Sequence, residues 1–352
     1  MTKKDSSKST ITNIEEVGEF GLIDKLTEDF KTVNKSTVKA VGDDTAVIES
    51  GDNYTLITKD LLVEGVHFDI SYTPLKHLGY KSVVVNLSDI YSMNGTPSQI
   101  VVGIAVSSRY SVEALKEIYS GIKLACEKYK VDLVGGDTCS SQAGLFISVT
   151  AVGHVEKSKI TYRKGAKQND LICVSGDLGA AYAGLLILKR EKEVFKVNPN
   201  AQPDISKYSY VLERQLKPEA GEHIINILKE LDIMPTSMID VSDGLASEVM
   251  HICENSKTGA QLFEEKIPID PETIAVADEF DINPTTFALN GGEDYELLFT
   301  ISQKDYEKID IKSHIKTIGY ITDASEGVSV VTNAGQQVPL KAQGWDAFKS
   351  GK

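Results

Sequence analysis

The sequence predicts an α+β protein with two lobes. Its 352 residues suggest about two domains. Short strand-like runs alternate with two long helical patterns in the first half, and a polar, charged segment at Lys157–Asn169 then leads into the second half. We therefore expect a loose tail at residues 1–12, an N-terminal domain at 13–157 and a C-terminal domain at 158–352.

The elements of the first half follow from the spacing of apolar residues. Apolar residues that recur with helical spacing predict helices, and short apolar runs rich in β-branched residues predict strands. In chain order, we expect a helix at Glu19–Thr27, strands at Val38–Ala40, Thr45–Glu49 and Tyr54–Thr58, a helix at His77–Met93, a strand at Ile100–Ser107, a helix at Val112–Tyr129, and strands at Val131–Val134 and Leu145–His154.

The second half repeats a succession of strand, acidic turn and helix. A proline near the first turn supports a helix that begins at Pro218, and polar composition predicts a loop at Glu191–Asp204. The expected strands are Leu171–Val174, Met238–Val241, Gly259–Phe263, Tyr295–Ile301, Ile315–Ile321 and Gly327–Val331; the expected helices are Leu178–Lys189, Pro218–Leu231, Leu245–Asn255, a short one near Pro271–Asp278 and a helical turn at Asp305–Ile309.

Composition narrows the class of partner. A net charge of −14 argues against nucleic acid, whose phosphates select basic surfaces. The longest apolar stretch, Gly179–Leu188, is too short to span a bilayer, so we expect no membrane contact. The four cysteines are scattered without a CxxC pair, and the polar first residues lack the apolar core of a signal peptide. These features predict a cytoplasmic protein.

Aspartates gather in five short segments that lie beside or within apolar runs. Carboxylates so close to core segments are costly unless they are paired or bind a cation, and no comparable set of lysines or arginines flanks them. Oxygen ligands beside small residues suit Mg²⁺ better than zinc. We expect a Mg²⁺ site where the five segments converge: Gly42–Thr45, Thr58–Asp60, Leu87–Asp89, Gly135–Thr138 and Asp240–Gly244.

The aspartates of the first half also have structural interpretations. Asp43 and Asp44 are adjacent, so one could bind metal while the other organises a turn. Asp89 shares a helical stripe with Val85 and Met93, which favours a role in a site. The alternative for Asp89 is a buried carboxylate paired with serine or backbone amides.

Three segments could hold phosphate. Gly136 would let the backbone approach a phosphate while Asp137 holds a bridging metal, or the two could form a tight turn. In Asp240–Gly244 a strand-to-helix junction would expose amides to an anion, although Ser242 or Asp243 could simply cap the helix. Arg163 could grip a phosphate or remain a solvated charge.

Three further residues could contact an organic substrate. His67 could hydrogen-bond a substrate or be a satisfied core histidine, and Glu293 could accept from a substrate amine or flank a turn. Trp345, the only tryptophan, could stack on a heteroaromatic ring or plug a core. The sequence contains no GxxxxGK[ST] loop, no GxGxxG and no kinase HRD and DFG set, so a nucleotide would be held through metal and backbone amides.

These motifs, in this order, resemble the thiamine-monophosphate kinase family, within the superfamily that includes aminoimidazole ribonucleotide synthetase. The resemblance covers nearly the whole chain and implies ATP-dependent phosphorylation of thiamine monophosphate to thiamine diphosphate, the last step in making that coenzyme, by direct in-line transfer with several Mg²⁺ ions. It also implies a homodimer in which a mixed N-terminal sheet forms a shared barrel, and a C-terminal α/β lobe. The motifs are GEFGLI (Gly18–Ile23), GDDTAV (Gly42–Val47), LLVEGVHF (Leu61–Phe68), VNLSDI (Val85–Ile90), VGGDT (Val134–Thr138), DVSDGL (Asp240–Leu245) and GGEDYELLF (Gly291–Phe299).

The resemblance further assigns roles to single residues. It implies catalysis by Asp43, Asp89, Asp137 and Asp240; ATP contacts from Gly136, Asp137, Arg163 and Ser242; thiamine contacts from His67, Glu293 and Trp345; and metal contacts from Asp43, Thr58, Asp60, Asp89, Asp137, Asp240 and Asp243. Lys59 stands where relatives often have threonine, so its backbone carbonyl would serve the metal. Ala347 replaces the histidine of a C-terminal GxDHF pattern.

Other functions stay open on this fold. An aminoimidazole ribonucleotide synthetase-type ligase also uses ATP and metal, but that family lacks the GGEDYEL and LVEGVHF motifs. A non-catalytic Mg²⁺–nucleotide-binding relative would bind Mg-ATP without turnover. Selenophosphate synthetase would need a reactive cysteine near the N-terminus and a carbamoyl-dehydrating maturation factor one near the C-terminus; Cys126 and Cys253, the first and last cysteines, match neither.

Overall fold

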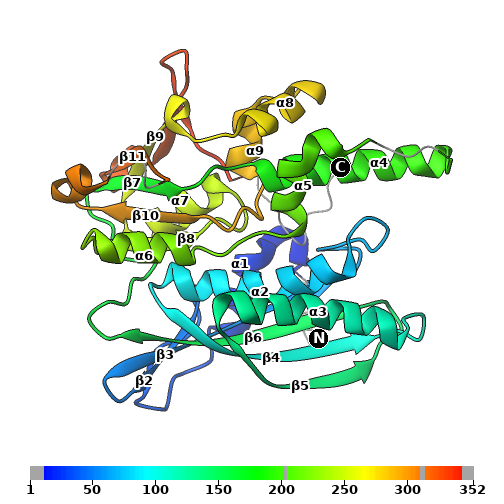
Figure 1. Cartoon of the computed structure of the whole chain (residues 1–352). Helices are drawn as coiled ribbons and strands as arrows, with labels where there is room; N and C mark the ends of the chain where they lie inside the picture. The colour runs from blue at the N-terminus through cyan, green and yellow to red at the C-terminus, as the bar shows by residue number, and fades with distance from the viewer. Residues whose placement is uncertain (1–11, 201–203, 310–313, 343–352) are drawn as a thin grey trace, which may run out of the picture.

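Two mixed sheets with their helices form two lobes, one above the other, in the computed structural model (Figure 1). The structure describes residues 12–200, 204–309 and 314–342. Strands and helices are segregated into separate layers rather than alternating through one parallel sheet, which confirms the α+β class. None of the helices in these ranges is both long enough and apolar enough to cross a membrane.

The first lobe is a six-stranded sheet with helices on one face. The strands are β1 (Thr37–Lys39), β2 (Ala46–Ser50), β3 (Asn53–Val63), β4 (Thr96–Val106), β5 (Asp132–Ser140) and β6 (Phe146–Glu156), in the order β1-β2-β3-β6-β4-β5. Neighbours are antiparallel except the parallel pair β4 and β5. Helices α2 (Leu75–Ser92) and α3 (Val112–Tyr129) cover the face that looks toward the second lobe, and none of the described helices covers the opposite face (Figure 1).

Close packing of α2 against α3 depends on two glycines. A Cβ on Gly79 of α2 would lie 1.9 Å from the Ile118 carbonyl oxygen, and one on Gly121 of α3 would lie 1.8 Å from the Lys76 carbonyl oxygen. Both distances are far inside van der Waals contact, so only glycine allows this approach. The packing fixes helix α2, which carries Ser88 and Asp89, between the first sheet and the second lobe.

The second lobe holds a seven-stranded sheet. Its strands are β7 (Leu171–Ser175), β8 (Ser237–Asp240), β9 (Gly259–Phe263), β10 (Leu297–Ile301), β11 (Ile315–Thr322), β12 (Val328–Val331) and β13 (Gln337–Pro339), in the order β13-β12-β9-β11-β7-β10-β8. The expectation of an alternating α/β lobe is corrected here. Among the described strands β9 and β12 run parallel and every other neighbouring pair is antiparallel.

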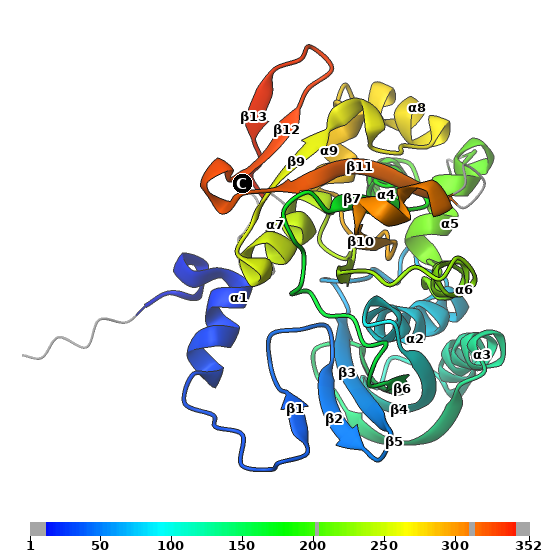
Figure 2. The same ribbon diagram turned by 90° about the vertical axis from the view of Figure 1, so that its left-hand side faces the viewer.

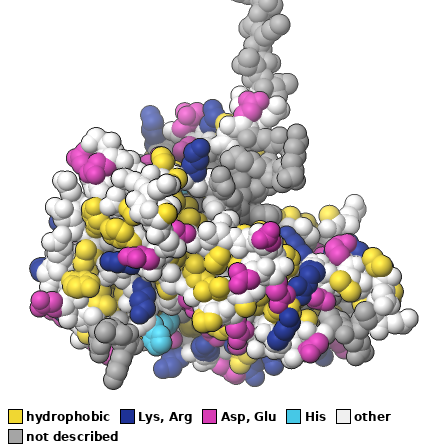
Figure 3. Space-filling view, turned by 90° about the horizontal axis from the view of Figure 1, so that it is seen from above, with side chains coloured by type: hydrophobic (Ala, Val, Ile, Leu, Met, Phe, Trp, Pro, Cys, Tyr) yellow, Lys and Arg dark blue, Asp and Glu magenta, His cyan; other side chains and the backbone are white. Residues whose placement is uncertain are grey.

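Helices surround the second sheet. They are α4 (Ala180–Val197), α5 (Ser209–Leu216), α6 (Glu222–Glu230), α7 (Leu245–Ser256), α8 (Pro271–Glu279) and α9 (Pro284–Asn290), with short 3-10 turns at Ser206–Tyr208, Glu264–Lys266, Gln303–Lys308 and Ala324–Glu326. Helix α1 (Ile14–Thr27) belongs to the first half of the chain but lies beside α7 of the second lobe (Figure 2), with the Phe20 and His251 rings 4.2 Å apart. On the face in Figure 3, basic side chains are scattered among acidic ones rather than gathered into one surface.

Several predicted elements have different limits in the structure. Strand β3 continues through Thr58–Asp60 to Val63, and β5 continues through Gly135–Thr138, so neither segment is a turn. A Cβ on Gly136 would lie 2.2 Å from the Val102 carbonyl oxygen, so this glycine serves the close pairing of β5 with β4. Helix α4 runs to Val197, so the expected loop at Glu191–Asp204 is helical in its first half. Elements α5, α9 and β13 were not predicted.

Candidate active site

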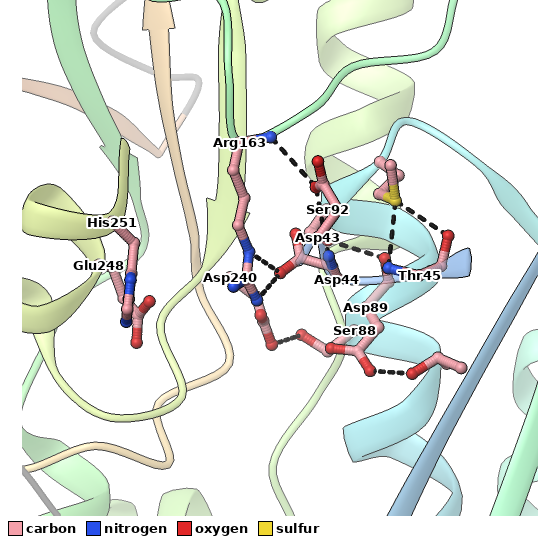
Figure 4. A network of polar contacts seen from close by, with 12 residues as sticks. Asp43, Asp44, Thr45, Ser88, Asp89, Ser92, Arg163, Asp240, Glu248 and His251 are labelled. Carbon is pink, nitrogen blue, oxygen red and sulfur yellow. Dashed lines mark hydrogen bonds and ion pairs between the residues drawn. The ribbon is translucent and has the colours of Figure 1, made fainter. Parts of the chain in front are cut away.

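Three aspartates from distant parts of the chain meet where the two lobes touch. Asp44 lies between β1 and β2, Asp89 on α2, and Asp240 at the end of β8 (Figure 4). One carboxylate oxygen from each lies within 4.8 Å of the others. Convergence of the acidic segments was predicted from the sequence, and the three segments that carry Asp44, Asp89 and Asp240 do converge.

Neighbouring donors hold each carboxylate in place. Ser92 Oγ donates to Asp44 Oδ2 at 2.6 Å, and Ser88 Oγ donates to Asp240 Oδ2 at 2.6 Å. Thr58 of β3 donates a hydrogen bond to Asp89. These contacts orient the oxygens toward a common centre, as a built metal site requires.

Arg163 forms an ion pair with Asp44, one of the three aspartates. Its Nε lies 2.7 Å from Asp44 Oδ1, its Nη2 also contacts that oxygen, and its backbone N–H donates to Asp43 at 3.2 Å. Asp44 is fully buried at its side chain, and Arg163 is 17% exposed. The guanidinium therefore anchors the acidic turn to the segment that joins the two lobes, using two of its five donors.

Further acids surround the three aspartates. Glu248 of α7 is buried and accepts from the Asp243 backbone N–H at 3.1 Å. Asp60 lies on β3, and its backbone N–H donates a hydrogen bond to Asn86 Oδ1 at 2.9 Å. Besides burial, the Glu19 carboxylate of α1 raises the pKa of Asp60 electrostatically. The site thus contains many more carboxylates than cations.

Burial makes this concentration of negative charge costly. Burial raises the pKa of Asp43 to about 6, with Asp44 adding to the shift, and raises the pKa of Asp60 to about 6, with Glu19 adding. Burial, then Asp44, raises the pKa of Asp240 to about 7. Burial and neighbouring acids hold the pKa of Asp89 and of Glu248 well above their ordinary values. A site of oxygen ligands whose negative charge is so poorly balanced fits a hard divalent cation.

Asp137 does not join this group within one chain. It pairs with Gly103 of β4, which pairs with Ser148 of β6, which pairs with Leu61 of β3. Three strand spacings amount to about 14 Å. The buried residues Val102 and Ile104 face the helices, so Gly103, and with it Asp137, faces the uncovered side of the sheet. Gly136 and Asp137 are both exposed on the edge strand β5.

Strand alternation also separates Lys59 from its neighbours. Thr58 and Asp60 face the aspartates, whereas the Lys59 side chain is exposed on the other face of β3. Ser242 follows β8, and its carbonyl oxygen accepts from the Glu293 backbone N–H at 2.7 Å. This bond ties the Asp240–Gly244 segment to the Gly291–Tyr295 segment.

Glu293 belongs to a second polar group, beside α2 and α5. Its Oε1 lies 2.9 Å from Lys81 Nζ, and its Oε2 accepts from Gln215 Nε2 at 2.8 Å. His67 Nδ1 accepts from the Val63 backbone N–H at 3.0 Å, so a neutral imidazole carries its proton on Nε2. Burial lowers the pKa of His67, with nearby Glu293 opposing the shift and Lys81 adding to it. Trp345 and Ala347 lie outside the described residues.

Three residues of these groups, Lys81, Gln215 and Glu248, were missed as participants. Lys81 and Gln215 had no local signal, because they meet Glu293 only when α2, α5 and the Gly291–Tyr295 segment pack together. Glu248 had one: an acid in the first turn of a helix that follows an acidic segment. Asp44 was recognised, but as an alternative to Asp43, whereas the structure places Asp44 with Asp89 and Asp240.

The class of protein with this two-lobed α+β fold and an acidic site between its lobes follows from comparison with known families. Residues 42–155 match the family model "AIR synthase related protein, N-terminal domain". The thiamine-monophosphate kinase of Buchnera aphidicola (subspecies Schizaphis graminum) is 37% identical over 344 residues, which is 95% of this chain and 99% of that protein. The chain belongs to the thiamine-monophosphate kinase family.

Two further relatives agree. The thiamine-monophosphate kinase of Bacillus subtilis is 31% identical over 341 residues, covering 94% of this chain and 99% of that protein. A solved structure of AaThiL complexed with AMPPCP and TMP superposes with a TM-score of 0.82 at 33% identity, covering 97% of this chain and all of that one. The similarity therefore extends over both lobes and the junction between them.

Proposed function

We propose that the protein transfers the terminal phosphoryl group of ATP to thiamine monophosphate and releases thiamine diphosphate and ADP. The observation that carries this proposal is the meeting of Asp44, Asp89 and Asp240, contributed by both lobes, within 4.8 Å. Two relatives that match nearly the whole chain are named for this activity, and a third was solved with an ATP analogue and TMP. A site at the junction of the two lobes would hold donor and acceptor together.

Mg²⁺ is the metal that we propose for the acidic group. Its ligands would come from Asp44 and from the residues expected from the sequence: Asp43, Thr58, Asp60, Asp89, Asp240 and Asp243, with Lys59 contributing through its backbone carbonyl. When bound, Mg²⁺ neutralises phosphate charge during transfer. The short contacts from Ser88, Ser92 and Thr58 keep the carboxylates oriented for this task.

The chain's own residues would align the two phosphates rather than activate a nucleophile. A phosphate monoester oxygen is already anionic near neutral pH, so in-line transfer needs no strong general base. Arg163 and Ser242 would hold ATP beside the acidic group, and His67, Glu293 and Trp345 would hold the thiamine end. Asp43, Asp89, Asp137 and Asp240 would act at the reacting phosphates. Rate enhancement would come from alignment and charge neutralisation.

We propose a homodimer that completes the site. The uncovered face of the first sheet exposes Leu61 (49%) and Val101 (38%), and β5 is an edge strand of the sheet formed by the described residues. An exposed apolar sheet face is typical of an interface. Because Asp137 lies on this side and Gly136 precedes it on the edge strand β5, we place both in the ATP site of the second copy, with the two sheets forming a shared barrel.

Two remaining expectations are also kept as proposals. The domain boundary near residue 157 is supported by the first sheet ending at Glu156 and the second beginning at Leu171. A reducing, cytoplasmic location is supported by the cysteines, because all four are free thiols.

Product analysis tests the function. Purified protein, Mg-ATP and thiamine monophosphate should yield thiamine diphosphate on chromatography, with none formed when Mg²⁺ is removed by chelation. Mg-ATP binding without product would favour a non-catalytic relative. Turnover of formylglycinamidine ribonucleotide instead would favour the aminoimidazole ribonucleotide synthetase reaction and contradict the proposal.

A further inference from the structure

The side-chain amide of Gln215 is a buried polar group that the acidic site does not use. It projects from α5 and the residue is 6% exposed. Nε2 donates to Glu293 Oε2 at 2.8 Å, whereas Oε1 has no hydrogen-bond partner in the part of the chain that the structure describes. Buried acceptors are normally satisfied, so the carbonyl oxygen points to a contact with a ligand.

Glu293 fixes which way the amide is turned. A carboxylate beside the Lys81 ammonium accepts hydrogen bonds, so the nitrogen of the Gln215 amide, rather than its oxygen, must face it. Lys81 Nζ also donates to the Gln215 backbone carbonyl at 3.1 Å. Lys81, itself buried, thus holds both Glu293 and Gln215 from helix α2.

Two polar groups of the Gln215 side chain remain available to a ligand: the Oε1 acceptor and one Nε2–H donor. A glutamine amide has one acceptor oxygen and two N–H donors, and Glu293 takes one of those donors. When Glu293 takes the hydrogen that points away from Oε1, the remaining donor and acceptor lie side by side. They complement a ring nitrogen next to an exocyclic amine, the same pattern by which asparagine and glutamine bind adenine.

We propose that Gln215 recognises the aminopyrimidine ring of thiamine monophosphate. Oε1 accepts from the exocyclic amine, and the second Nε2 hydrogen donates to the adjacent ring nitrogen. This inference rests on the proposed function, because it takes thiamine monophosphate as the acceptor substrate. It makes Gln215 a specificity-determining residue and Lys81 a positioning residue.

The surroundings of Gln215 suit such a ring. The Glu293 side chain beside Gln215 is 27% exposed, so a ligand can reach its carboxylate, which offers a second acceptor to an amine. His67 presents Nε2–H as a further donor. Burial raises the pKa of Tyr72 to about 12, with Glu293 contributing, which places an aromatic side chain near the same carboxylate.

Substrate discrimination tests the inference. We would measure kcat/KM for thiamine monophosphate and for its analogue with an oxo group in place of the exocyclic amine, using wild type and Gln215→Leu. Wild type should prefer the amine by about tenfold or more. Gln215→Leu should lose most of that preference, through a higher KM for thiamine monophosphate, with kcat and the KM for ATP nearly unchanged. Gln303→Leu, an exposed glutamine in Gln303–Lys308, is the matched control and should keep the preference.

The possible results distinguish failure of the proposed function from failure of the role of Gln215. A wild-type protein that makes no thiamine diphosphate would overturn the proposed function. A wild-type kinase whose Gln215→Leu variant keeps the full preference for the amine would overturn the role of Gln215 alone. If Gln215→Leu does not fold, Gln215→Met, which has an unbranched side chain of similar length, gives the same comparison.

Discussion

Ser88 Oγ donates a hydrogen bond to Asp240 Oδ2 across 2.6 Å, and this contact joins helix α2 of the first lobe to strand β8 of the second. Both residues are buried. Asp89 follows Ser88 directly, so the same contact sets two carboxylates from different lobes beside each other. The acidic site is therefore a property of the docked lobes, and neither lobe forms it alone.

Neutralising Asp89 should remove activity without unfolding the protein. Asp89→Asn keeps the side-chain shape but removes a charge, and the loss of thiamine diphosphate formation should reach about 10²–10³-fold. Because burial raises the pKa of Asp89, the neutral side chain should leave the melting temperature unchanged or higher. Asp52→Asn, in the exposed turn between β2 and β3, is the control and should keep full activity. Near-normal turnover of Asp89→Asn would contradict the metal-site assignment.

Without divalent metal, stability should fall as pH rises from about 4 to 7. The pKa of Asp43 and of Asp60 is about 6 and that of Asp240 about 7, all raised by burial first above the ordinary 3.8. Across this window the folded state binds more protons than the unfolded chain, so the free energy of unfolding decreases with pH. Chemical unfolding at several pH values in the presence of a chelator measures the slope.

Mg²⁺ should reverse that trend. Protons and Mg²⁺ compete for the same carboxylates, so added Mg²⁺ should raise the melting temperature more at pH 8 than at pH 5. Asp240→Asn should reduce the Mg²⁺ effect at pH 8. An equal Mg²⁺ shift at both pH values would place the bound metal on other groups.

Lys81 should affect the thiamine side and not the ATP side. Lys81→Met removes the cation at 2.9 Å from Glu293, so the KM for thiamine monophosphate should rise about tenfold. The KM for ATP should stay within about twofold, and Lys81→Arg should recover part of the loss. Lys123→Met, an exposed lysine on α3, is the matched control. A rise in the KM for ATP alone would move Lys81 to the nucleotide.

Mixed dimers test the placement of Asp137. Asp137→Asn and Asp89→Asn should each be inactive by themselves. If Asp137 acts in the site of the second copy, co-expression of the two variants should restore about a quarter of wild-type activity, because half of the dimers regain one complete site. Differently tagged chains allow the mixed dimer to be isolated and its activity measured. No recovery in the isolated mixed dimer would assign Asp137 to its own chain's site.

Elements with strong local signals were predicted closely from the sequence. Helix α3 begins and ends at the predicted residues, Val112 and Tyr129, and Ser111 caps it by accepting from the Ala114 backbone N–H at 3.2 Å. Strand β9 likewise matches at both ends. Where local and tertiary preferences conflict, the tertiary preference decides: Gly135–Thr138 has the composition of a turn, yet pairing with β4 draws it into β5.

The residues of the candidate site were predictable from the sequence where they lie in short segments of unusual composition. Asp89, Asp240 and the Asp43–Asp44 pair stood out because acids next to apolar runs are unusual. Lys81 and Gln215, 134 positions apart, did not stand out. Each is an ordinary residue in a helix, and its role is created by the docking of α2 against α5.

The most direct measurement follows ADP and thiamine diphosphate in the same reaction, with wild type and Asp89→Asn, with and without thiamine monophosphate. The proposed site predicts equal amounts of the two products from wild type, strict dependence on Mg²⁺ and thiamine monophosphate, and loss of both products in the variant. ADP release that ignores thiamine monophosphate, or normal product formation by Asp89→Asn, would contradict a phosphoryl-transfer site at the junction of the two lobes.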